Sequence, residues 1–185
     1  MNYFVKIATA FVLISNYTFA QNNQKDVPKV ETKMDLFASK VGSIVKFIDY
    51  KLPNLKTSQM VVVETRIRKI MSNGEVNYFY QIEKQGQYAS PTASIEYSDL
   101  KEVIKAFNVL KSELNNDLSL NPNYLENKFT TSDGFRIGYY IDESKPTWFL
   151  KLEKYGTDTS VFIKDIQVLE NAFNEALNKI EELKK

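Results

Sequence analysis

The residues best suited to chemistry in this sequence are arginines and aromatic residues that alternate along predicted β-strands. Alternate residues of a strand point to the same side of a sheet, so each alternating set would form one face. Rings on such a face can stack on a flat ligand, and guanidinium groups can hold a phosphate, a carboxylate or a sugar hydroxyl. The candidate ligand-binding residues on the outer faces of the predicted sheets are Arg66, Arg68, Phe79, Gln81, Arg136, Tyr140, Phe149 and Lys151.

The same face has a simpler interpretation as the solvated side of an antiparallel sheet. If Asn73-Gly74 forms a two-residue turn, Arg68 lies opposite Phe79 and Arg66 lies opposite Gln81, with Glu83 diagonal to Arg66. Cross-strand pairs of this kind contribute roughly a few tenths of a kcal/mol each and need no ligand. A binding face and a solvated face are therefore both open interpretations.

The composition excludes several kinds of active site. The chain contains no histidine and no cysteine, so Ser-His-Asp and Cys-His nucleophiles, histidine or thiolate metal sites, and disulfides are all excluded. An enzyme would have to work with carboxylates, for which Asp49, Glu64 and Glu83 are the candidates. We predict no catalytic residue, no metal and no cofactor.

Residues 1–20 have the order of a cleavable secretory signal peptide. Lys6 precedes an apolar run from Ile7 to Ile14, and small residues lead to Ala20. We predict cleavage between Ala20 and Gln21, which would make the protein periplasmic or secreted, and no later apolar run is long enough for a transmembrane anchor.

The predicted signal peptide contains one of the 24 basic residues and none of the acidic ones, so 23 basic and 23 acidic residues remain. A net charge of zero argues against a partner held by bulk charge, such as duplex nucleic acid or an anionic membrane.

Hydrophobic periodicity predicts one domain over residues 34–185, after a polar, flexible leader over 21–33. A short helix over 34–42 is followed by predicted strands over 44–52, 61–70, 76–84 and 93–97. A helix then begins at Asp99, whose side chain would cap the first turn together with Glu102, and it ends at 115–117. The second half has predicted strands over 124–131, 135–142, 147–154 and 159–163, and a helix that begins at Asp165.

The second half repeats the first in sequence as well as in order. Residues 65–86 match residues 135–156 without gaps, so that Arg66 corresponds to Arg136 and Phe79 to Phe149. After a shortening of four residues, Phe107 corresponds to Phe173. These matches predict an α+β fold of two tandem ββββα repeats, about 44–115 and 124–184, with antiparallel sheets packed on two helices around a pseudo-twofold axis. The residues expected to face the helices are Val63, Thr65, Ile67, Tyr78, Tyr80 and Ile82, and Phe135, Ile137, Tyr139, Trp148, Leu150 and Leu152.

The tandem ββββα order resembles, at the level of topology, the Whirly and PUR-type families of single-stranded nucleic-acid-binding proteins, over about residues 44–183. The resemblance implies that bases stack on exposed aromatic residues of the sheets beside basic residues. The contact face would then consist of Arg66, Arg68, Phe79, Arg136, Tyr140, Phe149 and Lys151. The segments 45–53 and 149–156 also resemble parts of small uncharacterised exported bacterial proteins, a resemblance that implies no activity.

Three functions follow as hypotheses. The leading one is an exported, non-catalytic module, monomeric or homodimeric, that binds a protein, a glycan or a small molecule through the outer sheet face or at the seam between the repeats. The second is a protein of the Whirly or PUR kind that binds extracellular or imported single strands. The third is a carboxylate-based hydrolase.

Overall fold

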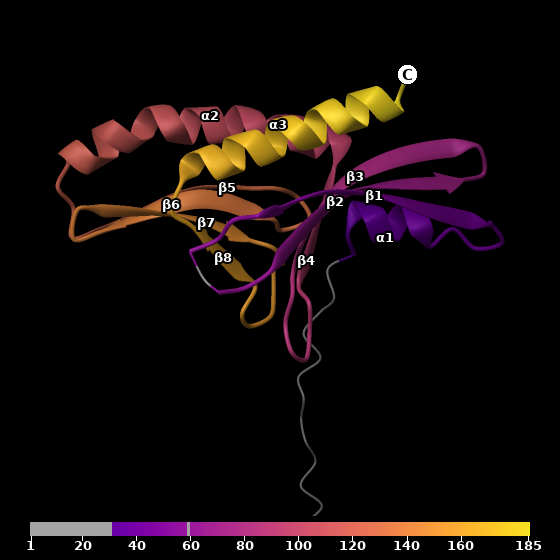
Figure 1. Cartoon of the computed structure of the whole chain (residues 1–185), viewed down its shortest axis with the longest axis horizontal. Coiled ribbons are helices and arrows are strands. Elements are labelled where there is room, and N and C mark those ends of the chain that lie inside the picture. The colour runs from indigo at the N-terminus through magenta and orange to yellow at the C-terminus, as the bar shows by residue number, and fades with distance from the viewer. Residues whose placement is uncertain (1–30, 59) are drawn as a thin grey trace, which may run out of the picture.

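The fold is α+β, with two four-stranded antiparallel sheets that are each followed by a helix (Figure 1). The computed structural model describes residues 31–58 and 60–185, so the predicted signal peptide and most of the predicted leader lie outside the described residues. The strand orders β1-β2-β3-β4 and β5-β6-β7-β8 confirm the two ββββα repeats. The elements are α1 (Lys33–Ala38), β1 (Val45–Leu55), β2 (Val63–Ser72), β3 (Glu75–Lys84), β4 (Thr92–Glu96), α2 (Tyr97–Ser119), β5 (Tyr124–Thr130), β6 (Arg136–Asp142), β7 (Lys145–Lys151), β8 (Ser160–Ile163) and α3 (Ile166–Leu183).

The central hairpin of each repeat turns over two residues. Asn73 and Gly74 both have positive φ, 51° and 80°, as a type I′ turn requires. The pairing of Arg68 with Phe79 and of Arg66 with Gln81 confirms the predicted register. The second repeat turns at the equivalent positions, residues 143 and 144, which also have positive φ although neither is glycine.

The two long helices begin in different ways. The predicted start of the second helix at Asp165 is confirmed, and the Asp165 side chain caps α3 by accepting a hydrogen bond from Gln167 N at 3.0 Å. The predicted cap at Asp99 is wrong, since β4 leads directly into α2 at Tyr97. The Asp99 carboxylate instead accepts bonds of 2.6 and 2.7 Å from Lys33 Nζ of α1. None of the helices in the described part of the chain is long and apolar enough to cross a membrane.

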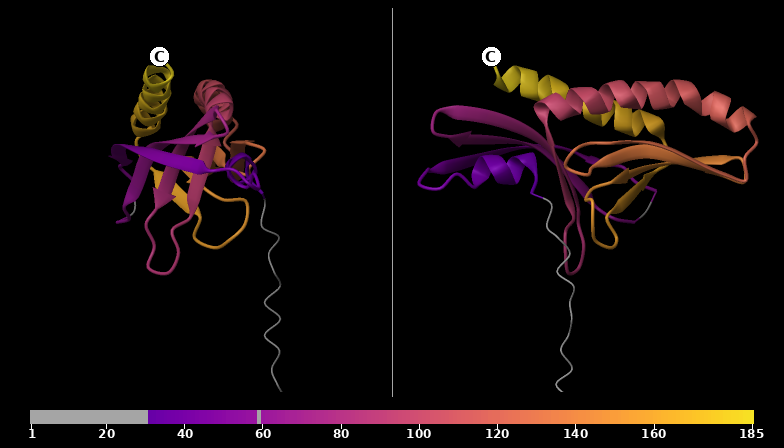
Figure 2. Two further views of the ribbon diagram at one scale, coloured as in Figure 1. Left: turned by 90° about the vertical axis from the view of Figure 1, so that its right-hand side faces the viewer. Right: turned by 180° about the vertical axis from the view of Figure 1, so that it is seen from behind.

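Both long helices lie on the same side of the two sheets, whereas α1 lies on the opposite side of the first sheet (Figures 1 and 2). Each long helix also packs on the sheet of the other repeat: α2 contacts β5 and β6, and α3 contacts β1 and β2. The two repeats therefore share one hydrophobic core.

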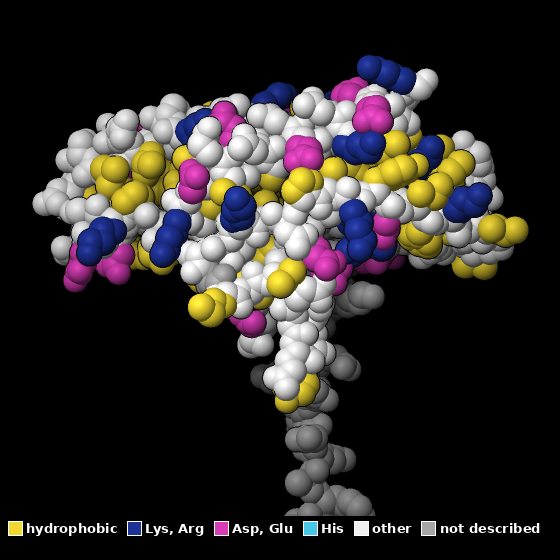
Figure 3. Space-filling model, viewed as in Figure 1, with side chains coloured by type: hydrophobic (Ala, Val, Ile, Leu, Met, Phe, Trp, Pro, Cys, Tyr) yellow, Lys and Arg dark blue, Asp and Glu magenta, His cyan; other side chains and the backbone are white. Residues whose placement is uncertain are grey.

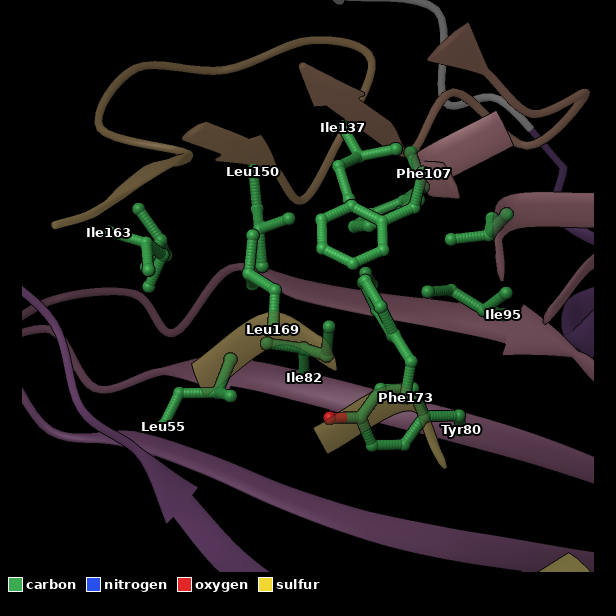
Figure 4. Close-up of a cluster of buried hydrophobic side chains, with 14 of the residues drawn as sticks. Leu55, Tyr80, Ile82, Ile95, Phe107, Ile137, Leu150, Ile163, Leu169 and Phe173 are labelled. Atoms are coloured by element: carbon green, nitrogen blue, oxygen red, sulfur yellow. The ribbon is translucent and has the colours of Figure 1, made fainter. Parts of the chain in front are cut away.

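Aromatic side chains connect the two long helices and the two sheets in this core (Figure 4). The ring of Phe107 in α2 meets that of Trp148 at 5.5 Å and that of Phe173 at 5.7 Å, both edge to face. Phe173 in α3 meets Tyr80 of the first sheet at 6.3 Å. Such edge-to-face pairs contribute beyond their buried area. The predicted helix-facing residues, Trp148 among them, belong to this core or pack against it, with Tyr78 and Thr65 at its edge.

We expect Phe107→Ala to destabilise both repeats at once, because this ring of the first repeat packs on Trp148 and Phe173 of the second. The expected loss is about 3–5 kcal/mol in the free energy of unfolding, as for other buried phenylalanines. Urea unfolding followed by circular dichroism should show one transition moved to lower urea. Val109→Ala, on the exposed side of the same helix, should leave the midpoint nearly unchanged. Two separate transitions would contradict a shared core.

Candidate functional site

The outer face of the first sheet is covered by α1. Phe79 is 0% exposed and packs with Ile70 and with Phe37 of α1, with Met34 at the edge of the cluster. The expectation that Phe79 contacts a ligand is therefore wrong. Phe79 is buried because Met34 and Phe37 are spaced so that they lie on the same side of α1, and this apolar side packs on the sheet. The helix starts within the predicted leader, since Thr32 caps it.

The arginines of the first sheet are held in ion pairs. Arg66 donates through Nε to Gln81 at 2.8 Å and through Nη2 to Glu83 at 2.5 Å. Arg68 donates through Nε and Nη2 to both oxygens of Asp49, at 2.7 and 2.6 Å. The hydrogen bonds from Arg68 hold the pKa of Asp49 below its usual range. Asp49 and Glu83 are thus partners of arginine, and Nη1 of each guanidinium has no hydrogen bond within the described residues.

A pocket of about 550 Å³, which we call the seam pocket, opens where the two repeats meet. One side is formed by the start of α1 and by the outer face of the first sheet. The other side is formed by the second repeat, from the β5–β6 loop and the segment after β7. Three of the predicted ligand-binding residues, Arg66, Arg68 and Gln81, lie here. The full lining is Thr32, Met34, Asp35, Arg66, Arg68, Gln81, Thr92, Ser94, Asp133, Phe135, Leu152, Glu153, Lys154, Tyr155 and Gly156.

The second repeat contributes carboxylates to the seam pocket. Asp133 accepts a hydrogen bond from Lys33 N at 3.0 Å, and Glu153 accepts one from Thr92 N at 3.0 Å. Neither carboxylate forms an ion pair within 4.0 Å among the described residues. Burial raises the pKa of Asp133. The pocket lining therefore combines two guanidinium groups and Asp35 on the side of the first repeat with Asp133, Glu153 and Lys154 on the side of the second repeat.

A glycine allows the two loops of the second repeat to approach each other beside the pocket. Gly134 has φ of 92°, and a Cβ there would lie 2.5 Å from Cβ of Lys154. Any other residue would force these loops apart. The ammonium of Lys154 lies 5.5 Å from the ring centroid of Tyr155, also in the pocket lining.

The outer face of the second sheet carries four aromatic residues that no helix among the described residues covers. We call them the aromatic shelf: Tyr124, Tyr140, Phe149 and Phe162. Tyr140 lies at the centre, with ring centroids 6.3 Å from Tyr124, 6.4 Å from Phe149 and 6.4 Å from Phe162. The sequence predicts Tyr140 and Phe149 on this face. It does not predict Tyr124 and Phe162, because they lie on the outer strands β5 and β8, and the hairpin turn determines only how the two central strands pair.

Two cations stand directly opposite each other at one end of the shelf. Arg136 pairs with Lys151 across β6 and β7, and neither forms an ion pair within 4.0 Å in the described part of the chain. Like charges in this position disfavour the sheet. Elsewhere charges balance: Figure 3 shows acidic and basic side chains interspersed over one side of the molecule, without a large region of one sign.

A buried lysine ties the two repeats together beside the seam pocket. Lys84, at the end of β3, is 5% exposed. Its Nζ donates to the carbonyl oxygens of Asp158 and Ser160, each at 3.1 Å, and to Asp158 Oδ1 at 2.5 Å. The equivalent residue of the second repeat, Lys154, is exposed. Only one of the two matched lysines therefore holds the repeats together.

We expect Lys84→Ala to lower the free energy of unfolding by about 2–4 kcal/mol, because it removes the three hydrogen bonds that this buried ammonium donates to the second repeat. Lys154→Ala is the matched control and should change stability by less than about 0.5 kcal/mol, as for most surface substitutions. Thermal or urea unfolding measures both. Equal losses of unfolding free energy in the two variants would show that Lys84 does not hold the two repeats together.

Comparison of the chain with protein-family models, curated proteins and solved structures gave no match.

Proposed function

We propose that the protein is an exported, non-catalytic binding module whose seam pocket holds a small zwitterionic ligand, such as an amino acid or a short peptide. The observation that carries the proposal is a pocket of about 550 Å³ whose lining includes both guanidinium groups and carboxylates. Pockets of roughly 300–1,000 Å³ with a few convergent polar groups are typical of small-molecule sites. The proposal of export rests on the signal-peptide pattern of residues 1–20.

The charged groups of the pocket suit the two ends of such a ligand. A ligand carboxylate would accept hydrogen bonds from Nη1 of Arg66 and Arg68. A ligand ammonium would lie against Asp133, whose pKa is raised by burial and which forms no ion pair within 4.0 Å among the described residues. Met34 and Phe135 offer apolar surface for a side chain.

The carboxylates support a binding role over a catalytic one. Asp49 and Glu83 form ion pairs with arginines. Glu64 is the residue opposite Glu83 in the register of β2 and β3. The most deeply buried acid, Asp117, accepts a 2.6 Å bond from Tyr139 in the core, where burial and this bond raise the pKa of Tyr139 to about 12. Among the described residues no group of three acids could hold a metal.

The nucleic-acid alternative retains only part of its contact face. That hypothesis requires exposed rings on both sheets, and the ring of Phe79 lies under α1. On the second sheet the rings of the shelf are exposed or half-buried, and they lie beside the half-buried Arg136 and Lys151. Binding of single strands is therefore the less favoured function.

We expect free amino acids and dipeptides to bind the protein, and Thr92→Trp to weaken the binding at least about tenfold, which corresponds to 1.4 kcal/mol. Thr92 lines the pocket on the edge strand β4, so the larger ring would fill ligand space without entering the core. Isothermal titration calorimetry measures the affinity for each member of the panel.

Thr130→Trp, on the exposed edge strand β5, is the matched control and should bind as the unchanged protein does. Analogues with an acetylated amine or an amidated carboxylate should bind more weakly than the parent zwitterion. Absence of binding across the panel, or equal binding by both tryptophan variants, would refute the proposal.

A further inference from the structure

The aromatic shelf occupies the same place in the second repeat that the seat of α1 occupies in the first. Under α1, the seat is made by Val45, Ile70 and Phe79, with Glu96 opposite Phe79 on the edge strand. The strand register gives the equivalent positions in the second sheet. Val45 corresponds to Tyr124, because they pair with the equivalent residues Ser72 and Asp142. Glu96 corresponds to Phe162, because they pair with the equivalent residues Phe79 and Phe149. The four positions of the seat therefore become, in the same order, Tyr124, Tyr140, Phe149 and Phe162.

The first repeat also shows how a helix lies on such a seat. Gln81 Nε2 lies 3.4 Å from Sδ of Met34, in the first turn of α1. Asp35, also in the first turn, lines the seam pocket together with Arg66 and Gln81. The N-terminal end of the helix is thus at the Arg66–Gln81 end of the seat.

The equivalent end of the shelf differs in charge. Arg136 and Lys151 correspond to Arg66 and Gln81, so a neutral residue is replaced by a second cation. In the first repeat Glu83 neutralises Arg66, whereas the corresponding Glu153 bonds to Thr92 N. A helix N-terminus carries partial positive charge and would be repelled here unless acidic residues accompany it.

We infer that the aromatic shelf is a docking site for a short amphipathic helix of a partner protein, with acidic residues in its first turn. The apolar side of the helix would pack on the four rings, as Met34 and Phe37 pack on the first sheet. Its acids would pair with Arg136 and Lys151, which have no ion-pair partner among the described residues. This uses the helix-in-groove mode of recognition, with apolar residues three or four positions apart.

The charge distribution favours a helix over a nucleic-acid strand. The two cations that form no ion pair within 4.0 Å among the described residues lie at one end of the shelf, whereas Lys128 on β5 is paired with Glu126. At the other end, Asp142 lies beside Tyr124 across β5 and β6. A strand that crossed the shelf would bring phosphates close to these carboxylates, but a helix with acids in one turn would not.

A peptide based on α1 provides the probe. The seat on the first sheet is filled by the chain's own α1, so an added peptide of residues 31–40 is expected to reach only the shelf. Lys33→Glu in the peptide supplies further acid, and a covalent staple between positions 36 and 40, both exposed in the protein, keeps it helical. Amide chemical shifts of the isotope-labelled protein then report the binding surface and the affinity.

We expect shift changes centred on Tyr140, Phe149 and Phe162. Binding should weaken about tenfold in the protein variant Arg136→Gln with Lys151→Gln, and it should weaken as salt rises. Lys46→Gln with Lys69→Gln, on the first sheet, is the matched double variant and should bind normally. A control peptide with Met34→Ser and Phe37→Ser should not bind.

Several results would overturn the inference. One such result would be chemical-shift changes at residues outside the shelf. Another would be equal affinities of the two double variants for the peptide. Binding of an oligothymidine at the shelf without binding of the peptide would assign the surface to nucleic acid. A dimer detected by sedimentation, together with protection of these rings from solvent, would assign the surface to a second copy of the chain. Since Thr92 lies on the first sheet and the shelf lies on the second, Thr92→Trp should leave peptide binding unchanged.

Discussion

The structure depends on one constraint: a single ββββα repeat cannot bury both its sheet and its helix. Each repeat therefore covers part of the other, because α2 lies partly over the second sheet and α3 lies partly over the first. The edge-to-face contact of Phe107 with Phe173 sits where the two helices and two sheets meet. Since both helices use the same side of the sheets, the opposite side of each sheet is left for other contacts.

The two repeats use that opposite side differently. In the first, α1 covers the apolar part and acids neutralise the arginines, so the face contributes to stability. In the second, rings and two like charges stay uncovered at the same positions, an arrangement that stability alone does not favour. The seam pocket lies between these two situations, with one side from each repeat. Equivalent positions of the two repeats thus lie in different surroundings.

Local patterns in the sequence were sufficient for most of the architecture. The Asn73-Gly74 turn determined the register of the first hairpin, and the internal match extended that register to the second. Periodicity identified every strand and both long helices to within a few residues. The errors concern contacts between distant segments. Two contacts depend on where α1 lies in space: its packing over Phe79 and the ion pair of Lys33 with Asp99. No local pattern in the sequence specifies the position of α1. For the same reason the seam pocket, the burial of Lys84 and the membership of Tyr124 and Phe162 in the shelf were not predicted.

The packing of each long helix on both sheets has a consequence for how the chain acquires its structure as it is made. When α2 has been synthesised, half of the surface on which it must lie does not yet exist, and the first sheet still lacks α3. Contacts between segments so far apart in sequence slow folding and delay it until late in synthesis. The chain should therefore stay unfolded until its last helix is available, which is the state in which polypeptides are threaded through narrow translocation pores.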